Sequence, residues 1–303
     1  MTQKATYLTA ATYQTLLVES GPAGVLVVTL NRPEEGNAVN RTMHEELLRL
    51  LFEIRDAPDL GAVVLTGSGR VFCGGGSMSF LNEVWDSDYR HSGRILEQGI
   101  SLVRELLSVR PPVVVALNGG AVGLGATLAL LGDIIVMADT AKIADTHVKV
   151  GIVAGDGGTL LWPSRVGMAR AKQYLLTGDT VTAEEALAMG LVNAVVPKDQ
   201  VRDTALEWAK RFADGPRLAI AYTKQAMNAT LLREAAHQVP LAMALEARTF
   251  GQPDVREGIQ AFVDKRQPSW PSAVPESDAT AMELNGEDTA TGRTAAVPTG
   301  SKE

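Results

Sequence analysis

The chain has 303 residues, of which 46% are hydrophobic, enough to bury the core of one large domain or of two. A formal net charge of −7 argues against a nucleic-acid partner, and a single cysteine, Cys73, rules out an intramolecular disulfide framework and favours a reducing, cytoplasmic compartment. Neither a signal-peptide pattern nor an apolar run of about 20 residues is present, so we expect a soluble protein without a membrane partner.

The first part of the chain is expected to form a hairpin and then a helix. Residues 1–12 are polar and are predicted to be a flexible leader. Residues 16–19 and 25–30 are β-rich and flank a Gly-Pro turn, which predicts a β-hairpin. Asn40 follows a loop as the predicted N-cap of a helix. The apolar residues of that helix recur at helical spacing, at Met43, Leu47, Leu50, Leu51 and Ile54.

Two glycine-rich turns follow strand-like runs and organise the rest of the chain. The run at 62–65 leads into Gly74-Gly75-Gly76, and the run at 113–117 leads into a turn and a helix over 121–131. Glycine lets a backbone approach a ligand closely, and the first turn of a helix leaves amide N–H groups unpaired. Two such turns, each offering one N–H, are what a two-donor oxyanion hole needs.

The segment between the two turns combines an irregular stretch with a helix. Residues 79–92 lack a clean periodicity and are interpreted as a mobile flap over the site. Residues 95–109 follow an amphipathic helical pattern that ends before two prolines. The repeated order of strand and helix favours an α/β layered core.

The C-terminal third of the chain is predicted to be helical and then disordered. A capping-box sequence at 182–185 opens a short helix. Asp254, with Glu257 three residues on, is expected to open the last helix. From residue 268 to residue 303 the chain has almost no large apolar residues, and we predict a disordered tail. The longer helical patterns cover 199–213, 216–231, 233–250 and 254–264.

Four motifs, in chain order, resemble those of the enoyl-CoA hydratase/isomerase (crotonase) superfamily. They are Asn31-Arg32-Pro33 with Asn37-Ala38, and the segments 72–76, 118–123 and 151–159. The resemblance covers about residues 15–266. It implies an α/β fold in which ββα repeats wind into a spiral over 13–198 and carry the active site. A C-terminal helical subdomain over 199–267 would make the trimer contacts.

The resemblance also implies an acyl-CoA substrate, as in fatty acid metabolism, with no cofactor beyond the coenzyme A of that substrate. It implies a homotrimer or a dimer of trimers. The amides of Gly76 and Leu124 would form the oxyanion hole that holds the thioester carbonyl as an enolate. For both glycine runs the alternative is a tight turn without a catalytic role. The coenzyme A contacts would fall at Gly74, Gly75, Ser77, Phe262 and Lys265.

The catalytic positions depart from the usual pattern of the family. Its hydratases typically carry two glutamates that hold and activate water, and these positions fall on Thr127 and His147. Threonine cannot take a proton at neutral pH, whereas imidazole, with an ordinary pKa of about 6.5, suits acid–base work. Asp156 is expected to bind one ring nitrogen of His147 and leave the other free as the base. The alternatives are a loop histidine without a catalytic role and an N-cap role for Asp156.

A branch of the superfamily that cleaves β-diketones by a retro-Claisen reaction has the same histidine–aspartate spacing. It resembles this chain at His147, Asp156 and Glu246. A further histidine of that branch falls on Leu124, so the match is partial. We interpret Glu246 as a structural residue on a helical face.

The remaining cysteine and histidines are interpreted as structural. Cys73 is expected to pack as a small apolar side chain rather than to act as a nucleophile. No metal site is predicted, because His44, His91 and His237 lack acidic or cysteine partners at metal-ligand spacing.

Three functions remain open from the sequence. The leading hypothesis is an enoyl-CoA hydratase-like lyase in which the His147–Asp156 pair handles water or the proton. The second is a C–C bond hydrolase that acts on a β-diketone without coenzyme A. The third is a non-catalytic member of the family, motivated by the loss of both glutamates.

Overall fold

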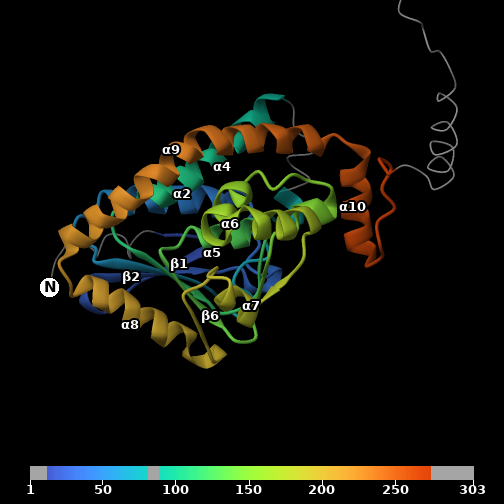
Figure 1. Cartoon of the computed structure of the whole chain (residues 1–303). Coiled ribbons are helices and arrows are strands. Elements are labelled where there is room, and N and C mark those ends of the chain that lie inside the picture. The colour runs from blue at the N-terminus through green and yellow to red at the C-terminus, as the bar shows by residue number, and fades with distance from the viewer. Residues whose placement is uncertain (1–11, 81–88, 274–303) are drawn as a thin grey trace, which may run out of the picture.

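The computed structural model describes residues 12–80 and 89–273 (Figure 1). Almost all of the predicted leader therefore lies outside the described residues. So do the centre of the predicted flap, 81–88, and the predicted tail from residue 274 onward. Within the described ranges, no helix combines the length and apolarity that a membrane crossing requires.

The core of the fold is a six-stranded, mostly parallel sheet. In spatial order its strands are β1 (Leu16–Ser20), β2 (Val25–Leu30), β3 (Ala62–Gly67), β4 (Val113–Leu117), β6 (Ile134–Ala138) and β9 (Ala194–Val196). The first two strands form the expected antiparallel hairpin, and every other neighbouring pair is parallel. All residues of β3 and β4 are buried, as is typical of parallel strands covered on both faces.

A second, smaller sheet positions the candidate site. It consists of β5 (Ala121–Val122), β7 (Lys142–Ala144) and β8 (Val181–Thr182), in that order. β5 and β7 pair in parallel, so their carboxyl ends meet at one edge. β5 leads into the turn at Gly123, and β7 ends directly before Asp145. The small sheet thus brings the second glycine turn and the residues around His147 together.

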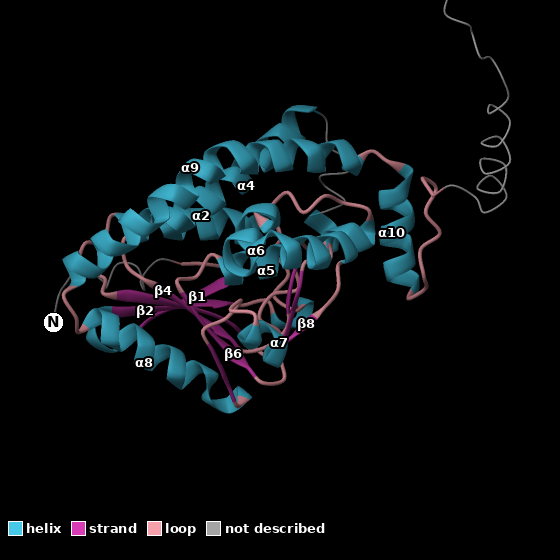
Figure 2. Cartoon of the chain, in the orientation of Figure 1, coloured by secondary structure: helices cyan, strands magenta, loops and turns pink. Residues whose placement is uncertain are grey.

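Helices cover both faces of the large sheet (Figure 2). The α-helices of the described residues are α2 (Arg41–Arg55), α4 (Tyr89–Ser108), α5 (Leu124–Leu130), α6 (Gly158–Thr177), α7 (Ala183–Ala188), α8 (Val201–Ala213), α9 (Arg217–Phe250) and α10 (Pro253–Asp264), the last of which lies beside the sheet. α8 packs on β3, β4 and β6 on one side of the sheet, whereas α2, α4 and α9 form a layer on the other side. This arrangement confirms the expected α/β layered core.

Two helix starts follow their local sequence signals. The Asn40 side chain caps α2 by accepting the Met43 N–H at 2.9 Å. Thr182 and Glu185 form the reciprocal bonds of a capping box at α7. Both predictions are confirmed, because a cap depends only on residues within one helical turn.

Three helix boundaries differ from the expectation. α4 begins at Tyr89, so residues 89–92 of the predicted flap are helical. α9 is one helix of 34 residues where two were predicted, because Leu232 at the supposed junction does not break a helix. α10 has Gln252 as its N-cap and Pro253 in its first turn, so the predicted capping role of Asp254 is wrong.

Carboxylates of α10 hold the beginning of the predicted tail. The Asp254 carboxylate accepts the Ser272 N–H at 2.9 Å. Glu257 accepts bonds of 2.6 and 2.9 Å from the Arg266 guanidinium and also binds the Ser269 N–H. Residues 268–273 therefore fold back along α10 and do not belong to a disordered tail.

Candidate active site

The two glycine-rich turns lie side by side. The Val122 N–H donates to the Cys73 carbonyl at 3.0 Å, and the Cys73 N–H donates to the Gly120 carbonyl at 3.1 Å. A Cβ on Gly75 would lie 2.9 Å from the Val122 carbonyl oxygen and 3.9 Å from the Leu124 nitrogen. Gly75 also has a φ of +96°, so the close approach of the two turns requires glycine there.

Gly76 and Leu124, the expected oxyanion-hole residues, line the same cavity. Leu124 is the first residue of α5, and Gly123 is its N-cap with a φ of +52°. Amides in the first turn of a helix have no partner within the helix. Among the described residues, neither the Gly76 nor the Leu124 amide donates a backbone hydrogen bond. Two N–H groups from neighbouring turns are therefore available to a ligand in this cavity.

The cavity has a volume of about 1200 Å³, enough for an extended ligand. Its walls combine these two backbone turns with the side chains of His147, Asp156 and Glu246. The residues that the sequence assigned to an oxyanion hole and to acid–base chemistry thus line one cavity.

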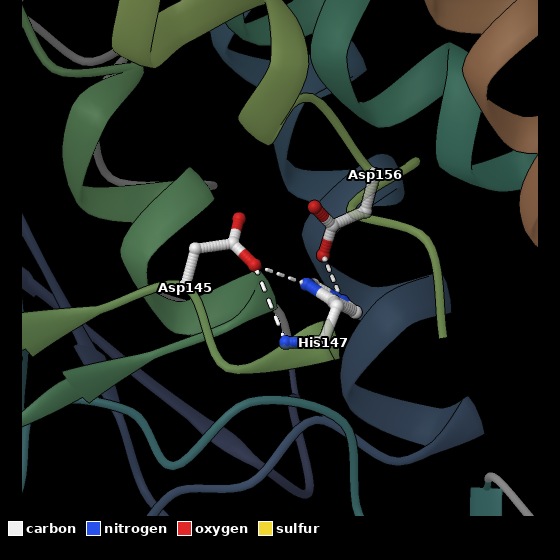
Figure 3. Close-up of side chains that lie close together, drawn as sticks. All are labelled: Asp145, His147 and Asp156. Atoms are coloured by element: carbon white, nitrogen blue, oxygen red, sulfur yellow. Dashed lines mark hydrogen bonds and ion pairs between the residues drawn. The ribbon is translucent and has the colours of Figure 1, made fainter. Parts of the chain in front are cut away.

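His147 lies between two carboxylates (Figure 3). Its Nδ1 is 2.6 Å from Oδ1 of Asp145, and its Nε2 is 3.4 Å from Oδ2 of Asp156. Asp145 directly follows β7 and is fully buried. The residue that orients the ring is therefore Asp145, not Asp156, and neither ring nitrogen is left free as the sequence-based interpretation required. The Asp-x-His spacing at the end of a strand was a signal that the sequence analysis missed.

Thr127, which stands at one of the two expected catalytic positions, binds Asp156. The Thr127 hydroxyl, on α5, donates to Oδ1 of Asp156 at 2.9 Å. Gly157, rather than Asp156, is the N-cap of α6, although the Asp156 carboxylate still accepts the N–H of Gly158, the first residue of that helix. Thr127 does not take part in proton transfer itself. The other carboxylate oxygen of Asp156, Oδ2, faces His147.

The two carboxylates determine the charge of the histidine. Burial lowers the pKa of His147, but the nearby charges of Asp145 and Asp156 outweigh it and raise the pKa well above 6.5. Burial also opposes ionisation of Asp156, yet His147 and the hydrogen bonds from Thr127 and Gly158 leave the pKa of Asp156 below its usual value. At neutral pH the pair is therefore an imidazolium beside a carboxylate.

Glu246, on α9, adds a carboxyl group to the wall of the cavity. Its side chain is 8% exposed, and Oε2 has no hydrogen-bond partner among the described residues. Burial raises the pKa of Glu246 to about 8, with the charges of Asp156 and Asp145 adding to the rise and that of His147 opposing it. Glu246 is therefore a neutral carboxylic acid at pH 7, a state that the sequence pattern did not reveal.

Asp145, His147 and Asp156 are close enough to be considered as metal ligands, with atoms within 4.8 Å of one another. A ligating histidine must offer an unprotonated nitrogen. Here both ring nitrogens face carboxylates and the ring is protonated. To bind a metal, His147 would therefore have to lose a ring proton first.

The expected coenzyme A contacts divide into two groups. Phe262, 68% exposed on α10, lines the cavity, whereas the backbone of Lys265 ends that helix in a left-handed conformation. Among the described residues, Arg266 rather than Lys265 lines the cavity, and Glu257 binds it. The other expected contacts, Gly74, Gly75 and Ser77, all line the cavity.

Cys73 lies beneath the first glycine turn and is fully buried. Burial raises the pKa of the Cys73 thiol to about 12, so the group remains a thiol. This environment agrees with the expected packing role.

Known proteins are similar to this chain over most of its length. The enoyl-CoA hydratase/isomerase family model matches residues 20–273. The 1,2-epoxyphenylacetyl-CoA isomerase of Escherichia coli is 36% identical over 82% of this chain and 95% of its own length. The short-chain-enoyl-CoA hydratase of Clostridium acetobutylicum is 34% identical over 80% of this chain and 92% of its own.

Two solved structures extend the comparison to the fold. An enoyl-CoA hydratase/isomerase from Mycobacterium paratuberculosis has a TM-score of 0.78 and 36% identity, over 82% of this chain and 99% of that one. A β-diketone hydrolase from the cyanobacterium Anabaena has a TM-score of 0.75 and 28% identity, over 84% of this chain and 99% of that one. Its structure contains (S)-3-oxocyclohexyl acetic acid.

Proposed function

Because the chain belongs to the enoyl-CoA hydratase/isomerase family, we propose that it converts an acyl-CoA thioester through an enolate intermediate. The amides of Gly76 and Leu124 hold the thioester oxygen. Donors aimed in advance at a developing oxyanion contribute a few kcal/mol each, roughly 3 when one is removed. The observation that carries the proposal is that His147 and Asp156 line the same cavity as these two amides.

The charge states of the pair define their roles in hydration. The Asp156 carboxylate takes a proton from water as the water oxygen bonds to C3 of an enoyl thioester. The electron pair of the C2=C3 bond forms a C1=C2 bond, and the carbonyl pair moves onto the thioester oxygen, which gives the enolate. The Nε2–H of His147 then protonates C2, and the thioester carbonyl reforms. The proton on Asp156 passes to Nε2, 3.4 Å away, and restores both groups.

In this scheme one carboxylate and one imidazolium replace the two glutamates that are usual in the family. Asp145 keeps Nδ1 of His147 protonated, so Nε2 is the nitrogen that exchanges its proton. The same pair supports isomerisation if Asp156 removes a carbon-bound proton in place of one from water. The products therefore distinguish hydration from isomerisation.

The first test is an assay of the purified enzyme with a short trans-2-enoyl-CoA. We expect loss of the conjugated thioester absorbance, and a decrease of about 100- to 10,000-fold in His147→Ala, the usual effect of removing a general acid. His237→Gln, on the exposed surface of α9, is the matched control. Unchanged turnover in His147→Ala would refute the assignment. Turnover that depends on His147 would also eliminate a non-catalytic member of the family.

A second candidate function is C–C bond cleavage of a β-diketone. It is supported by the likeness to the Anabaena hydrolase and by the gathering of His147, Asp156 and Glu246 in one cavity. Water, losing a proton to Asp156, would attack a ketone, and the amides of the glycine turns would hold the leaving enolate. Cleavage of a cyclic β-diketone without coenzyme A, together with failure to bind CoA esters, would favour this function.

We also propose a homotrimer or a dimer of trimers, assembled through the C-terminal helices. Large apolar side chains are exposed on α9 and α10. Leu241 is 61% exposed, Met227 is 74% exposed and Val263 is 57% exposed. Such an apolar surface is typical of a face covered by a partner. Light scattering on the purified chain should give three or six times the mass of the monomer, and a monomer would refute the proposal.

A further inference from the structure

His44 is a second histidine in the cavity, and the proposed acid–base chemistry does not use it. It lies in the first turn of α2, where its backbone N–H donates to the Asn40 carbonyl at 3.0 Å. The residue is 3% exposed and lines the cavity. Its Nδ1 is buried and has no hydrogen-bond partner among the described residues.

The His44 ring is an uncharged polar group. Burial lowers the pKa of His44 to about 4, so at physiological pH the ring carries one N–H donor and one nitrogen acceptor. A buried polar group left without a partner costs about 1–3 kcal/mol. A ligand atom that forms a hydrogen bond with the ring would remove that cost.

Among the described residues, no side chain forms a hydrogen bond with the His44 Nδ1. One face of the ring stacks on Phe80, with centroids 6.3 Å apart and an interplanar angle of 22°. The Ser77 hydroxyl nearby is already engaged, since it accepts the Phe80 N–H at 3.2 Å and lies 3.0 Å from the Ser79 hydroxyl. The same cavity is also lined by the apolar side chains of Ala38, Met78, Leu96 and Met243. Among the described residues, the His44 Nδ1 is thus an unpaired polar atom in a ring that packs against the apolar Phe80.

The start of α2 is tied to the proposed oxyanion hole. Val39 and Gly76 form a parallel β-bridge, in which the Val39 N–H donates to the Gly75 carbonyl at 2.7 Å. His44 lies one helical turn, roughly 5 Å, beyond the cap at Asn40. Because Gly76 and His44 line the same cavity, an acyl group whose carbonyl sits at Gly76 can extend towards the ring.

We propose that His44 recognises an oxygen on the acyl group, so that the enzyme prefers acyl-CoA thioesters that carry a hydroxyl, carbonyl or ether oxygen beyond C3. Plain alkyl chains would leave the ring nitrogens unpaired. This inference rests on the proposed function, because it takes the thioester to be held at Gly76 and Leu124. Phe80 is the positioning residue that fixes the plane of the ring.

Binding measurements test the inference without relying on turnover. Hexanoyl-CoA and a series of its derivatives, each with one hydroxyl on a successive carbon beyond C3, are titrated into the full chain in a calorimeter. The 3-hydroxy derivative is left out because it is a hydration product. We expect at least one derivative to bind about tenfold more tightly than hexanoyl-CoA, the difference that one good hydrogen bond makes.

Three variants assign the preference to His44. His44→Phe keeps a flat ring against Phe80 but has no nitrogen, and it should bind hexanoyl-CoA and its derivatives equally. His44→Gln keeps a donor and an acceptor and should retain part of the preference. His237→Gln, at an exposed histidine, should behave as the wild type.

Two outcomes would overturn the inference, and a third is separate. Equal affinity of the wild type for the whole series would refute the inference. This outcome needs no variant, so it does not depend on whether a variant folds. A preference that persists in folded His44→Phe would also refute it. If no CoA ester binds at all, the proposed function fails, and the role of His44 fails with it.

Discussion

The two histidines that line the cavity are in opposite chemical states, although both are largely buried. The side chain of His147 is 14% exposed and lies between the carboxylates of Asp145 and Asp156. His44 is 3% exposed, and burial alone determines its pKa. Burial lowers the pKa of both rings, but only at His147 do neighbouring charges reverse the effect. A buried histidine is therefore neutral by default and carries charge only where neighbouring carboxylates outweigh the effect of burial.

This difference gives the two walls of the cavity separate tasks. A protonated ring beside a carboxylate can donate and recover a proton, which the acid–base chemistry of a thioester enolate requires. A neutral ring in an apolar wall can only form hydrogen bonds. Substitutions around His147 should therefore change turnover. Substitutions at His44 should change stability in acid or the preference among acyl groups.

The largest effect is expected from Asp145→Asn, which removes the charge that keeps His147 protonated. Asparagine can still accept the Nδ1–H, so the ring should keep its orientation while the pKa of His147 falls. We expect turnover of an enoyl-CoA to fall about 100- to 10,000-fold. The limb of the rate profile that reports the imidazolium should move to lower pH.

The measurement is a pH–rate profile beside the control Asp139→Asn, an exposed aspartate after β6. A profile for Asp145→Asn that matches the wild type would show that Asp145 does not determine the charge of His147.

Glu246→Gln should alter the pH dependence of stability. The pKa of Glu246 is raised from 4.5 to about 8, so the stability gained from its proton is fully present below pH 4.5 and is lost as pH rises to 8. Glutamine stays neutral, so the free energy of unfolding of the variant should rise relative to that of the wild type over that window, by on the order of 4 kcal/mol. Urea unfolding across the window measures it, with Glu184→Gln on the surface of α7 as control. Parallel stability curves would contradict the prediction.

His44→Phe should show a smaller effect at acidic pH. The pKa of His44 is lowered from 6.5 to about 4, so its contribution is present above pH 6.5 and is lost as pH falls towards 4. The variant lacks this loss and should be less sensitive to acid, by roughly 3 kcal/mol. At His147 the pKa is raised, so stability should instead be lost as pH rises above 6.5. Urea unfolding of His44→Phe and of His147→Ala gives the stability of each variant relative to the wild type as a function of pH. The two differences should change with pH in opposite directions, and changes in the same direction would contradict the comparison.

Thr127→Val is expected to have the smallest effect of these substitutions. It removes the 2.9 Å bond to Asp156 but no charge, so the pKa of Asp156 should rise modestly. We expect a loss of about tenfold in turnover, in line with one lost hydrogen bond to a charged group. The acidic limb of the rate profile should move to higher pH. An unmoved limb would mean that Thr127 only packs against Asp156.

Much of the architecture was predictable from local sequence. The hairpin, the Asn40 cap and the capping box at Thr182 are confirmed, because each depends on residues close together in the chain. The predicted family and its fold are confirmed by the family model and the solved structures. The split of α9 was wrong because no residue breaks the helix, and the cap at Asp254 was wrong because its carboxylate binds Ser272 instead.

The sequence by itself determined the two glycine turns and the residue types of the acid–base pair, since turn geometry and side-chain chemistry are local properties. Only the tertiary structure decided their charges and partners. Thr127, on α5, binds Asp156 before the start of α6, and Glu246 reaches the cavity from α9. A pKa depends on which segments exclude water and which charges they bring near. Those distances are determined by the packing of elements far apart in the chain.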